Sequence, residues 1–506
     1  LGVGIEEDVC AAVNALSIPP GEYGRYARNP TQYVTSDYGT KHQVSIHGLQ
    51  PERTYTYYIS PIITTLFPEP DKKVELTRVF KEFADLDVLY ISRTPRYERF
   101  TVIYDEHGPA SYSGGLWPSV GTEVLFTAVV SNKGNLTSSP LIYQWWIDDQ
   151  LVESGSHPAM PPGHRQEFSI PWQWQEEAGQ VQFVVLAEDV SNELSERNNS
   201  RRIWTDALSF KFFVEPGVYE VFNSLKNMTG TYSFEDWAWA HIDRMDGMFE
   251  QCGVVESVFI DEVEVVDNLP NVGEHAPLAL EWDGRWGWDD REWTPNKIER
   301  EMGAVQYTLI HELMHQLGII DEYNFNFDPN YRDRNEVNQE IFWYPYKGIM
   351  NDLNSRTLSS HTQNALNANK GFRRGFFGEY LYDLPRHNTI ILKDQEGNVL
   401  SHAKIKIYQT DSNRILNEPV IEGMTDVHGR FILPNREISK EIITPTGHQL
   451  RANPFGHINV VGLNGLFLCE AQIDGNKVYG WLGIWEFNLA YWNGNEEEAE
   501  YTVVVR

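Results

Sequence analysis

The sequence predicts a multidomain fold in which all-β sandwich modules flank one α/β domain. Short β-prone segments separated by Gly, Pro, Asn and Asp dominate residues 30–215 and return after residue 386. Between them, strand-like and helix-like segments alternate, which is typical of an α/β domain. At 506 residues with 41% hydrophobic residues, the chain can bury several cores. We expect four parts, with boundaries at 1–83, 84–204, 205–385 and 386–506.

The charge and the cysteine content exclude several classes of function. The formal net charge is −31 and is spread along the chain, which disfavours binding to nucleic acid or anionic lipid. No apolar run approaches the roughly 20 residues that cross a bilayer, so we expect no membrane insertion. The chain opens at Leu1 without a leader, and we expect a processed chain or a fragment. The three cysteines lie far apart, which argues against a disulfide framework or a cysteine-ligated zinc ribbon.

Two segments before residue 205 carry the pattern of β-sandwich modules. In residues 42–59 hydrophobic and polar residues alternate, a turn follows at Pro51, and the alternation then resumes. This segment resembles part of a fibronectin type III module, in which the Tyr55 hydroxyl would hydrogen bond to nearby backbone. Residues 120–200 resemble the cell-adhesion-related domain of bacterial surface proteins, with an asparagine-glycine turn, a central tryptophan strand and a closing E-x-x-N-N run. The tryptophans of this block are interpreted as core in preference to a carbohydrate platform; they are Trp145, Trp146, Trp172 and Trp174.

Residues 205–385 change to alternating strands and helices. Strands are predicted at 210–215 and 257–266. Ser233 followed by Asp236 three positions later indicates a helix N-cap. Further helices are predicted at 303–318 and at 360–370, the second capped by Ser359 or Ser360.

After residue 386 the pattern is again that of β structure. Segments 388–410 and 423–435 predict strands, and 458–495 is expected to extend them with more β structure. The run Thr425, Asp426, Gly429 and Phe431 resembles the carboxypeptidase regulatory-like sandwich. That resemblance implies a spacer module without chemistry of its own.

The stretch H-E-x-x-H at residues 311–315 is the candidate catalytic motif. Residues four apart share one face of a helix, so His311 and His315 can each direct one imidazole nitrogen at a common zinc ion. Glu312 lies beside them, where its carboxylate can take the proton of a zinc-bound water as the general base of peptide hydrolysis.

The residues that follow extend the motif. Gly318 suits a sharp helix end, after which the chain can return Asp321 to the same ion, and Met350 lies in a predicted turn. Here the sequence resembles the metzincin zinc metalloproteases, with aspartate as third ligand as in the snapalysin-like branch. The resemblance implies His311, His315 and Asp321 as zinc ligands, Glu312 as general base and Met350 as the hydrophobic floor.

Several alternatives stay open at this point. Glu322 adjoins Asp321, and either carboxylate could reach the ion. In a gluzincin arrangement the third ligand would be a glutamate of a later helix. The stretch could also be a solvated helix with incidental histidines, or a relic that keeps zinc without activity. No tyrosine follows Met350 as in some branches, although Tyr346 is nearby.

Two secondary features accompany the motif. Residues 276–288 are the candidate for the edge strand that binds the substrate main chain, with Trp282, Trp286 and Trp288 as rim residues. A calcium site is a further candidate and would use Asp328, Asp333 and Asn335, although no defined loop spacing is present.

The sequence therefore favours a secreted or cell-surface zinc-dependent endopeptidase that acts on protein or peptide substrates. The β modules would hold it near a surface and could contact cell-surface or extracellular-matrix components. The alternative is an adhesive or filament-forming extracellular protein that carries a zinc-binding, weakly active or inactive peptidase-like domain.

Overall fold

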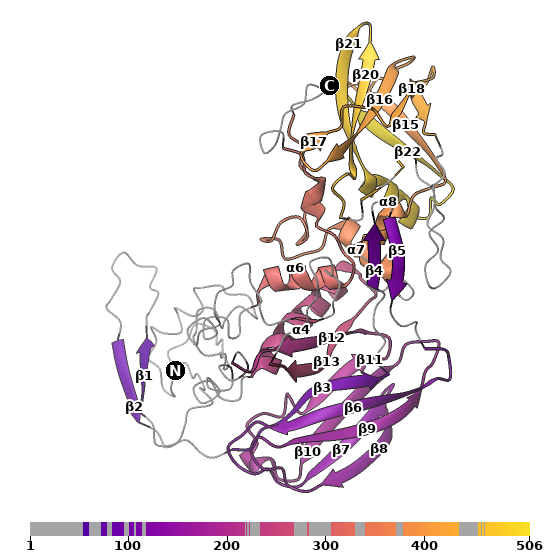
Figure 1. Ribbon diagram of the computed structural model, residues 1–506. Helices are drawn as coiled ribbons and strands as arrows, with labels where there is room; N and C mark the ends of the chain where they lie inside the picture. Colours follow the sequence, from indigo (N-terminus) through magenta and orange to yellow (C-terminus); the bar gives the residue numbers. More distant parts are fainter. Residues whose placement is uncertain are drawn as a thin grey trace.

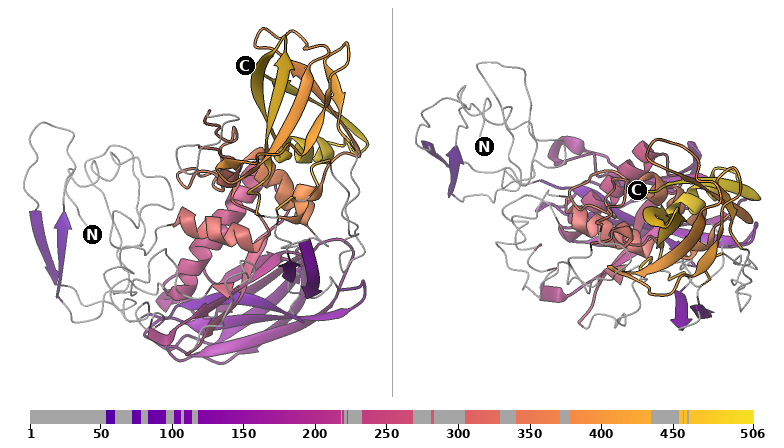
Figure 2. Two further views of the ribbon diagram at one scale, coloured as in Figure 1. Left: turned by 45° about the horizontal axis from the view of Figure 1, so that its top comes forward. Right: turned by 90° about the horizontal axis from the view of Figure 1, so that it is seen from above.

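The computed structural model of the chain is mostly β-sheet with few helices (Figure 1). It describes residues 54–59, 72–77, 83–95, 101–105, 108–113, 118–217, 219, 222, 233–267, 281–282, 305–328, 340–370, 378–434, 454–456, 458–459 and 461–506. Two sandwiches lie on opposite sides of a layer that contains the longer helices (Figures 1 and 2). No helix of these residues is long and apolar enough to span a membrane.

The N-terminal region is described only in part. Strands β1 (Thr54–Ile59) and β2 (Lys72–Thr77) form an antiparallel pair, as do β4 (Thr101–Asp105) and β5 (Gly108–Ser113). The side chain of Tyr55 lies outside the described part, so its predicted role stays a prediction.

The first sandwich is built from two antiparallel sheets. One sheet has the order β3-β6-β9 and the other β11-β10-β7-β8. The strands are β3 (Leu86–Thr94), β6 (Glu123–Asn132), β7 (Leu141–Ile147), β8 (Gln150–His157), β9 (Arg165–Gln173), β10 (Gln180–Ala187) and β11 (Ser200–Trp204), with a short 3-10 turn η1 (Val190–Asn192) before β11. In β10 buried residues alternate with more exposed ones, as expected for a strand with one face on a core.

Tryptophans fill part of the core between these sheets. Trp145 is fully buried, and its ring centroid lies 4.6 Å from that of Phe183. Trp174 is buried and Trp172 packs against the core, while Trp146 is half-buried. The interpretation of these residues as core is thus confirmed for Trp145 and Trp174.

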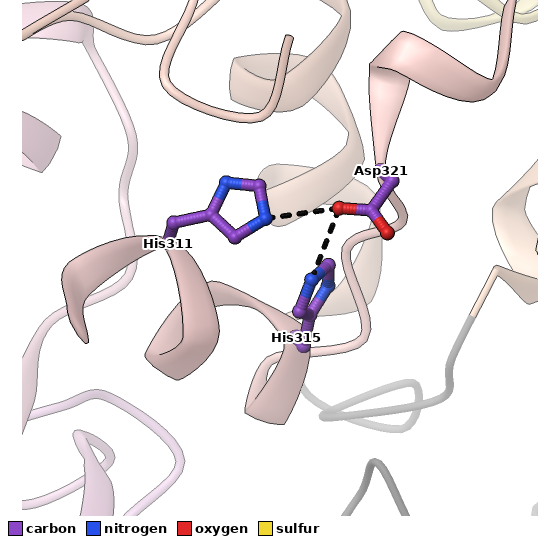
Figure 3. A group of neighbouring side chains, drawn as sticks. All are labelled: His311, His315 and Asp321. Atoms are coloured by element: carbon purple, nitrogen blue, oxygen red, sulfur yellow. Dashed lines mark hydrogen bonds and ion pairs between the residues drawn. The ribbon is translucent and has the colours of Figure 1, made fainter. Parts of the chain in front are cut away.

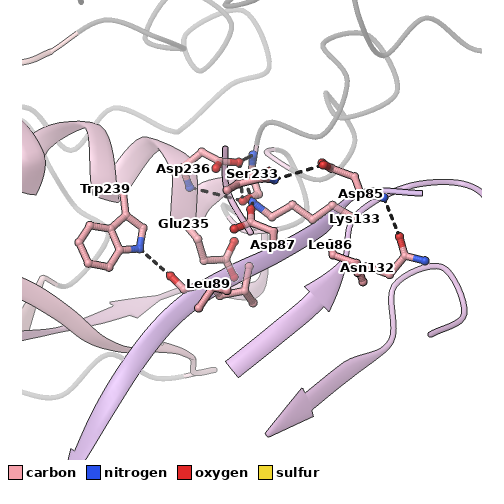
Figure 4. A network of polar contacts seen from close by, with 12 residues as sticks. Asp85, Leu86, Asp87, Leu89, Asn132, Lys133, Ser233, Glu235, Asp236 and Trp239 are labelled. Atoms are coloured by element: carbon pink, nitrogen blue, oxygen red, sulfur yellow. Dashed lines mark hydrogen bonds and ion pairs between the residues drawn. The ribbon is translucent and has the colours of Figure 1, made fainter. Parts of the chain in front are cut away.

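A buried ionic network joins this sandwich to the helical layer (Figure 4). The Lys133 ammonium is paired with Asp87 and lies 2.8 Å from an Asp236 carboxylate oxygen. The side chains of Lys133 and Asp87 are 3% and 1% exposed. Nearby, the indole N–H of Trp239 donates to the Leu89 carbonyl at 2.6 Å. These contacts connect strand β3 to the first long helix of the next region.

That helix, α4 (Phe234–Cys252), begins as predicted. The Ser233 and Asp236 side chains exchange hydrogen bonds with each other's backbone N–H, forming a capping box. The helix ends at Gly253, whose φ of +74° is left-handed. It packs on β13 (Val258–Val265), which runs parallel to β12 (Leu208–Val214), and β14 (Glu281–Trp282) pairs with the other side of β12.

Further helical segments lie in the described residues between β14 and residue 386. They are α6 (Tyr307–Gln316), the 3-10 turn η2 (Glu322–Phe325), α7 (Ser360–Asn369) and the 3-10 turn η4 (Glu379–Tyr382). Ser359 caps α7 by accepting from the Thr362 N–H, so of the two predicted caps the structure uses Ser359.

The second sandwich lies at the C-terminal end of the described chain. Its sheets have the orders β19-β15-β22 and β17-β16-β20-β21, with β18 paired to β16. The strands are β15 (His387–Lys393), β16 (Lys404–Asp411), β17 (Arg414–Ile415), β18 (Ile421–Met424), β19 (Arg430–Ile432), β20 (Leu466–Ile473), β21 (Asn476–Gly483) and β22 (Glu498–Val504). Asp426 accepts from two backbone N–H groups in the turn before β19, where Gly429 has a φ of +71°.

The expectation of more β structure over 458–495 is confirmed for β20 and β21 and was wrong for Ile484–Trp492, which form helix α8. An apolar run of this length suits a strand or a buried helix equally, so periodicity does not decide between them. Gly483 starts the helix and donates its N–H to Glu486 at 3.3 Å. Helix α8 packs against α7 and η4, so the C-terminal module shares a core with the preceding domain.

Candidate metal centre

Helix α6 carries the two histidines of the motif on one face. Its buried side is apolar and includes Leu309, Ile310, Leu313 and Met314, which anchor the helix in the core. His311 and His315 lie one turn apart, and their ring centroids are 4.8 Å from each other. The His311 and His315 side chains are only 4% and 12% exposed.

The chain reverses after α6 and brings Asp321 to the histidines (Figure 3). Gly318 has a φ of +89°, the left-handed backbone that the sequence predicted there. One carboxylate oxygen of Asp321 lies 2.9 Å from Nε2 of His311 and 3.2 Å from Nε2 of His315. These three residues form a group whose ligand atoms lie within 4.8 Å of one another.

The hydrogen bonding of both rings is suited to a cation. Nδ1 of His311 lies 2.9 Å from the Ile349 carbonyl, and Nδ1 of His315 lies 2.6 Å from the Ile319 carbonyl. A carbonyl only accepts, so Nδ1 carries the proton of a neutral ring and Nε2 keeps its lone pair. Both Nε2 atoms then face the Asp321 carboxylate, which is also an acceptor. A cation among the three atoms removes this mismatch.

The distances agree with that conclusion. Two ligands of a tetrahedral zinc ion, each about 2.0–2.1 Å from the metal, lie about 3.3 Å apart. The observed separations of 2.9 and 3.2 Å are close to this spacing. A proton on Nε2 of His315 removes the mismatch as well. Although burial opposes charge on both groups, the hydrogen bond to Asp321 then raises the pKa of His315, and the histidines hold the pKa of Asp321 well below its usual range. A metal ion would displace that proton. Two imidazole nitrogens and a carboxylate oxygen fit zinc.

Glu312 lies at the open side of this group. Its carboxylate comes within 4.0 Å of Nε2 of His315 and is 43% exposed. A carboxylate at this distance, outside the group of three donors, can exchange a proton with solvent and with a water between itself and the histidines.

Glu322 points away from the histidines. It is fully buried and accepts hydrogen bonds from the hydroxyls of Ser359, Thr362 and Tyr344. Of the two adjacent carboxylates, the structure therefore places Asp321 at the candidate metal centre. A gluzincin arrangement gains no support either, because the group of possible metal ligands found among the described residues contains Asp321 and no glutamate of a later helix.

The predicted methionine turn lies against the ligand segment. Met350 is fully buried, and its carbonyl accepts from the Glu322 N–H at 3.0 Å. The preceding carbonyl, of Ile349, holds His311. A Cβ on Gly348 would lie 2.4 Å from the Ser359 backbone nitrogen, so this tight turn requires glycine.

Sequence reasoning missed Tyr323. Its ring is parallel to that of His311, with 6.3 Å between centroids, and its hydroxyl hydrogen bonds to Asp321. The residue is 42% exposed, and burial together with the Asp321 carboxylate raises the pKa of its hydroxyl. Tyr346, considered from the sequence, packs against Tyr344 instead. In the sequence, the signal for this residue is a tyrosine two positions after Asp321.

The other predicted features lie largely outside the described residues. Of the candidate substrate strand, only Glu281–Trp282 is described, as β14 beside β12, while Trp286 and Trp288 are not. Of the candidate calcium ligands, Asp328 donates its backbone N–H to Asn413 at 2.9 Å, and Asp333 and Asn335 fall outside the description. Calcium binding therefore stays a prediction.

Comparison with known proteins finds similar solved structures but no matching family model. No family model matches the chain, and no curated protein matches it. The matching solved structures include the CARDB domain of a Pyrococcus furiosus protein in complex with di-metal ions, with 16% identity, 25% of this chain and 94% of that chain covered, and a TM-score of 0.18. A domain of a putative cell surface protein from Methanosarcina acetivorans matches with 18% identity and a TM-score of 0.17, and the match covers 24% of this chain and 90% of that chain. Bacteroides uniformis beta-glucuronidase 2 matches with 8% identity and a TM-score of 0.18, and the match covers 83% of this chain and 61% of that chain. At these TM-scores none of the likenesses bears on function.

Proposed function

We propose that this chain is a zinc-dependent endopeptidase whose metal is held by His311, His315 and Asp321. The observation that carries the proposal is the hydrogen bonding of the two rings. Each Nδ1 lies against a backbone carbonyl, so both Nε2 lone pairs face the same carboxylate oxygen of Asp321. Three protein donors with a free fourth position are characteristic of catalytic zinc sites.

The protein groups around that point have complementary roles in peptide hydrolysis. Zinc, when bound, supplies a Lewis acid that lowers the pKa of water and polarises a carbonyl. Glu312 accepts the proton of the attacking water and delivers it to the leaving amine, because its half-exposed carboxylate borders the donors. Tyr323, whose hydroxyl hydrogen bonds to Asp321 in this structure, would turn that hydroxyl toward the oxygen on which negative charge develops and donate a hydrogen bond to it.

We also propose that the protein acts outside the cell, on protein or peptide substrates. The support comes from the likeness of residues 120–200 to bacterial surface modules in sequence and from the sandwich that this segment forms. The strongly acidic charge of −31 is compatible with a soluble surface-associated protein and unfavourable for nucleic acid binding.

Metal analysis combined with proteolysis tests this function. The purified chain should contain one zinc per molecule and cleave unfolded casein, and a chelator should abolish cleavage. Glu312→Gln should keep the zinc and lower kcat/KM by about 10²–10⁴-fold. Glu250→Gln, an exposed site on α4, is the matched control and should have no effect.

Two results would count against the proposal. A chain that binds no zinc would refute the metal site itself. Stoichiometric zinc without hydrolysis, in wild type and control alike, would favour the alternative of an adhesive protein with an inactive peptidase-like domain.

A further inference from the structure

A buried carboxylate lies directly behind the candidate metal centre. Glu322 is 0% exposed, and its Oε1 atom accepts from Ser359 Oγ at 2.5 Å, Thr362 Oγ1 at 2.9 Å and the Tyr344 hydroxyl at 3.3 Å. Burying a carboxylate is costly unless several donors satisfy it. The chain thus keeps a buried carboxyl group, with three hydroxyl donors, next to a metal ligand.

The backbone of Glu322 links the turn that carries Asp321 to the segment that holds the His311 ring. Its N–H donates to the Met350 carbonyl at 3.0 Å, while the neighbouring Ile349 carbonyl holds Nδ1 of His311 at 2.9 Å. Asp321 precedes Glu322 in the chain and starts the 3-10 turn η2. With the Glu322 side chain anchored in the core, the backbone of η2 is fixed and the Asp321 carboxylate faces the histidines.

The anchor extends into the C-terminal module. Nδ1 of His361 lies 3.4 Å from Glu322 Oε1, and Nε2 of the same ring lies 3.2 Å from the amide oxygen of Asn488 on helix α8. The Asn488 amide nitrogen in turn contacts the carbonyls of Tyr380 at 3.0 Å and Asp383 at 2.9 Å. Glu322, His361 and Asn488 are all 0% exposed, so this chain of contacts is shielded from water.

We propose that Glu322 is a positioning residue for the third metal ligand, and that Asn488 of the C-terminal module supports it through His361. The inference rests on the proposed function, because it assumes that Asp321 binds metal. It changes the role of residues 386–506 from a spacer to a part of the metal-binding unit. Outer residues that orient metal ligands typically contribute 10–100-fold to metal affinity.

Metal affinity measured on the full chain tests this role. Glu322→Gln should raise the zinc Kd, determined by chelator competition, by about 10–100-fold. The visible absorption spectrum of the Co²⁺-substituted protein should change, since it reports ligand geometry, while the far-UV circular dichroism stays that of wild type. Asn488→Ala should shift the Kd in the same direction by a smaller factor.

A matched control separates positioning from general loss of stability. Asn388 is also buried, at 3% exposed, and it donates to the Pro385 carbonyl and accepts from Tyr501 within the second sandwich. Asn388→Ala should lower thermal stability and leave the zinc Kd within about twofold of wild type. If Glu322→Gln fails to fold, Thr362→Val removes one of the three hydroxyl donors, and it should still raise the Kd.

The outcomes distinguish the two proposals. A wild-type chain without zinc overturns the proposed function and this inference with it. A wild-type chain that binds zinc, with Kd and Co²⁺ spectrum unchanged in Glu322→Gln or, where that variant does not fold, in Thr362→Val, overturns the positioning role alone. An equal Kd shift in the Asn388→Ala control also overturns it, because the effect would then follow stability.

Discussion

Replacing Lys133 by methionine should destabilise the junction between the first sandwich and helix α4. The Lys133 ammonium is the cation that faces both Asp87 and Asp236, and it is 3% exposed. Methionine fills a similar volume without the charge. The variant therefore keeps the packing and leaves the Asp87 carboxylate, 1% exposed, without this cation.

The expected loss of folding stability in Lys133→Met follows from the burial of the ion pair. Removing one partner of a buried ion pair costs about 3–5 kcal/mol, because the remaining charge is neither paired nor hydrated. Asp236 contributes less of this cost, since it is 26% exposed and still accepts from the Ser233 N–H at 2.7 Å. Lys211→Met is the control, because Lys211 pairs with Glu262 and Glu264, which are 41% and 44% exposed. That loss should stay below about 1 kcal/mol.

The loss of folding stability in Lys133→Met should increase as pH rises. Burial already raises the pKa of Asp87, although Lys133 opposes the shift. Without Lys133 the pKa of Asp87 rises further in the folded state, so the folded chain binds a proton that the unfolded chain releases. Stability then falls as pH rises from the unfolded pKa of about 3.9 through the folded pKa. The Lys133→Met deficit is therefore expected to be small near pH 4 and largest near neutral pH.

Hydrogen exchange of peptides from β3 and α4, together with urea unfolding at several pH values, measures this effect. Adding Asp87→Asn to Lys133→Met should recover part of the lost stability, because it removes the uncompensated charge. The reasoning is refuted if Lys133→Met costs no more than Lys211→Met, or if its cost is the same at pH 4 and pH 7.

Three further predictions concern the candidate site and the C-terminal module. Asp321→Ala should weaken zinc binding by more than the roughly 10–100-fold that loss of an outer contact costs, as chelator competition will show. Tyr323→Phe should lower kcat by about 10²–10³-fold with unchanged zinc content, measured by peptide cleavage; equal kcat would exclude its proposed role. Burial raises the pKa of Glu486 to about 7 from its usual 4.5, so this residue should cost stability as pH rises between those values. Glu486→Gln should reduce that loss in thermal melts at pH 5 and 8.

The candidate site shows which of its parts a sequence can reveal. The His311 and His315 pair follows from helical spacing alone, and Gly318 marks the reversal because few other residues adopt its backbone. The choice between Asp321 and Glu322 could not be made in this way. Adjacent residues point in different directions, and the direction was set by the hydroxyls of Ser359 and other distant residues.

The sequence by itself determined the features that depend on a few consecutive residues. The capping box of Ser233 and Asp236 is an example, because its hydrogen bonds close within one turn of helix. Only the tertiary structure decided that residues 484–492 form a helix, since an apolar run takes the conformation that its surroundings can bury. The same holds for the buried pairing of Lys133 with Asp87, which lie far apart in the chain. Such contacts depend on how the strands and helices pack, and short sequence patterns carry little information about that.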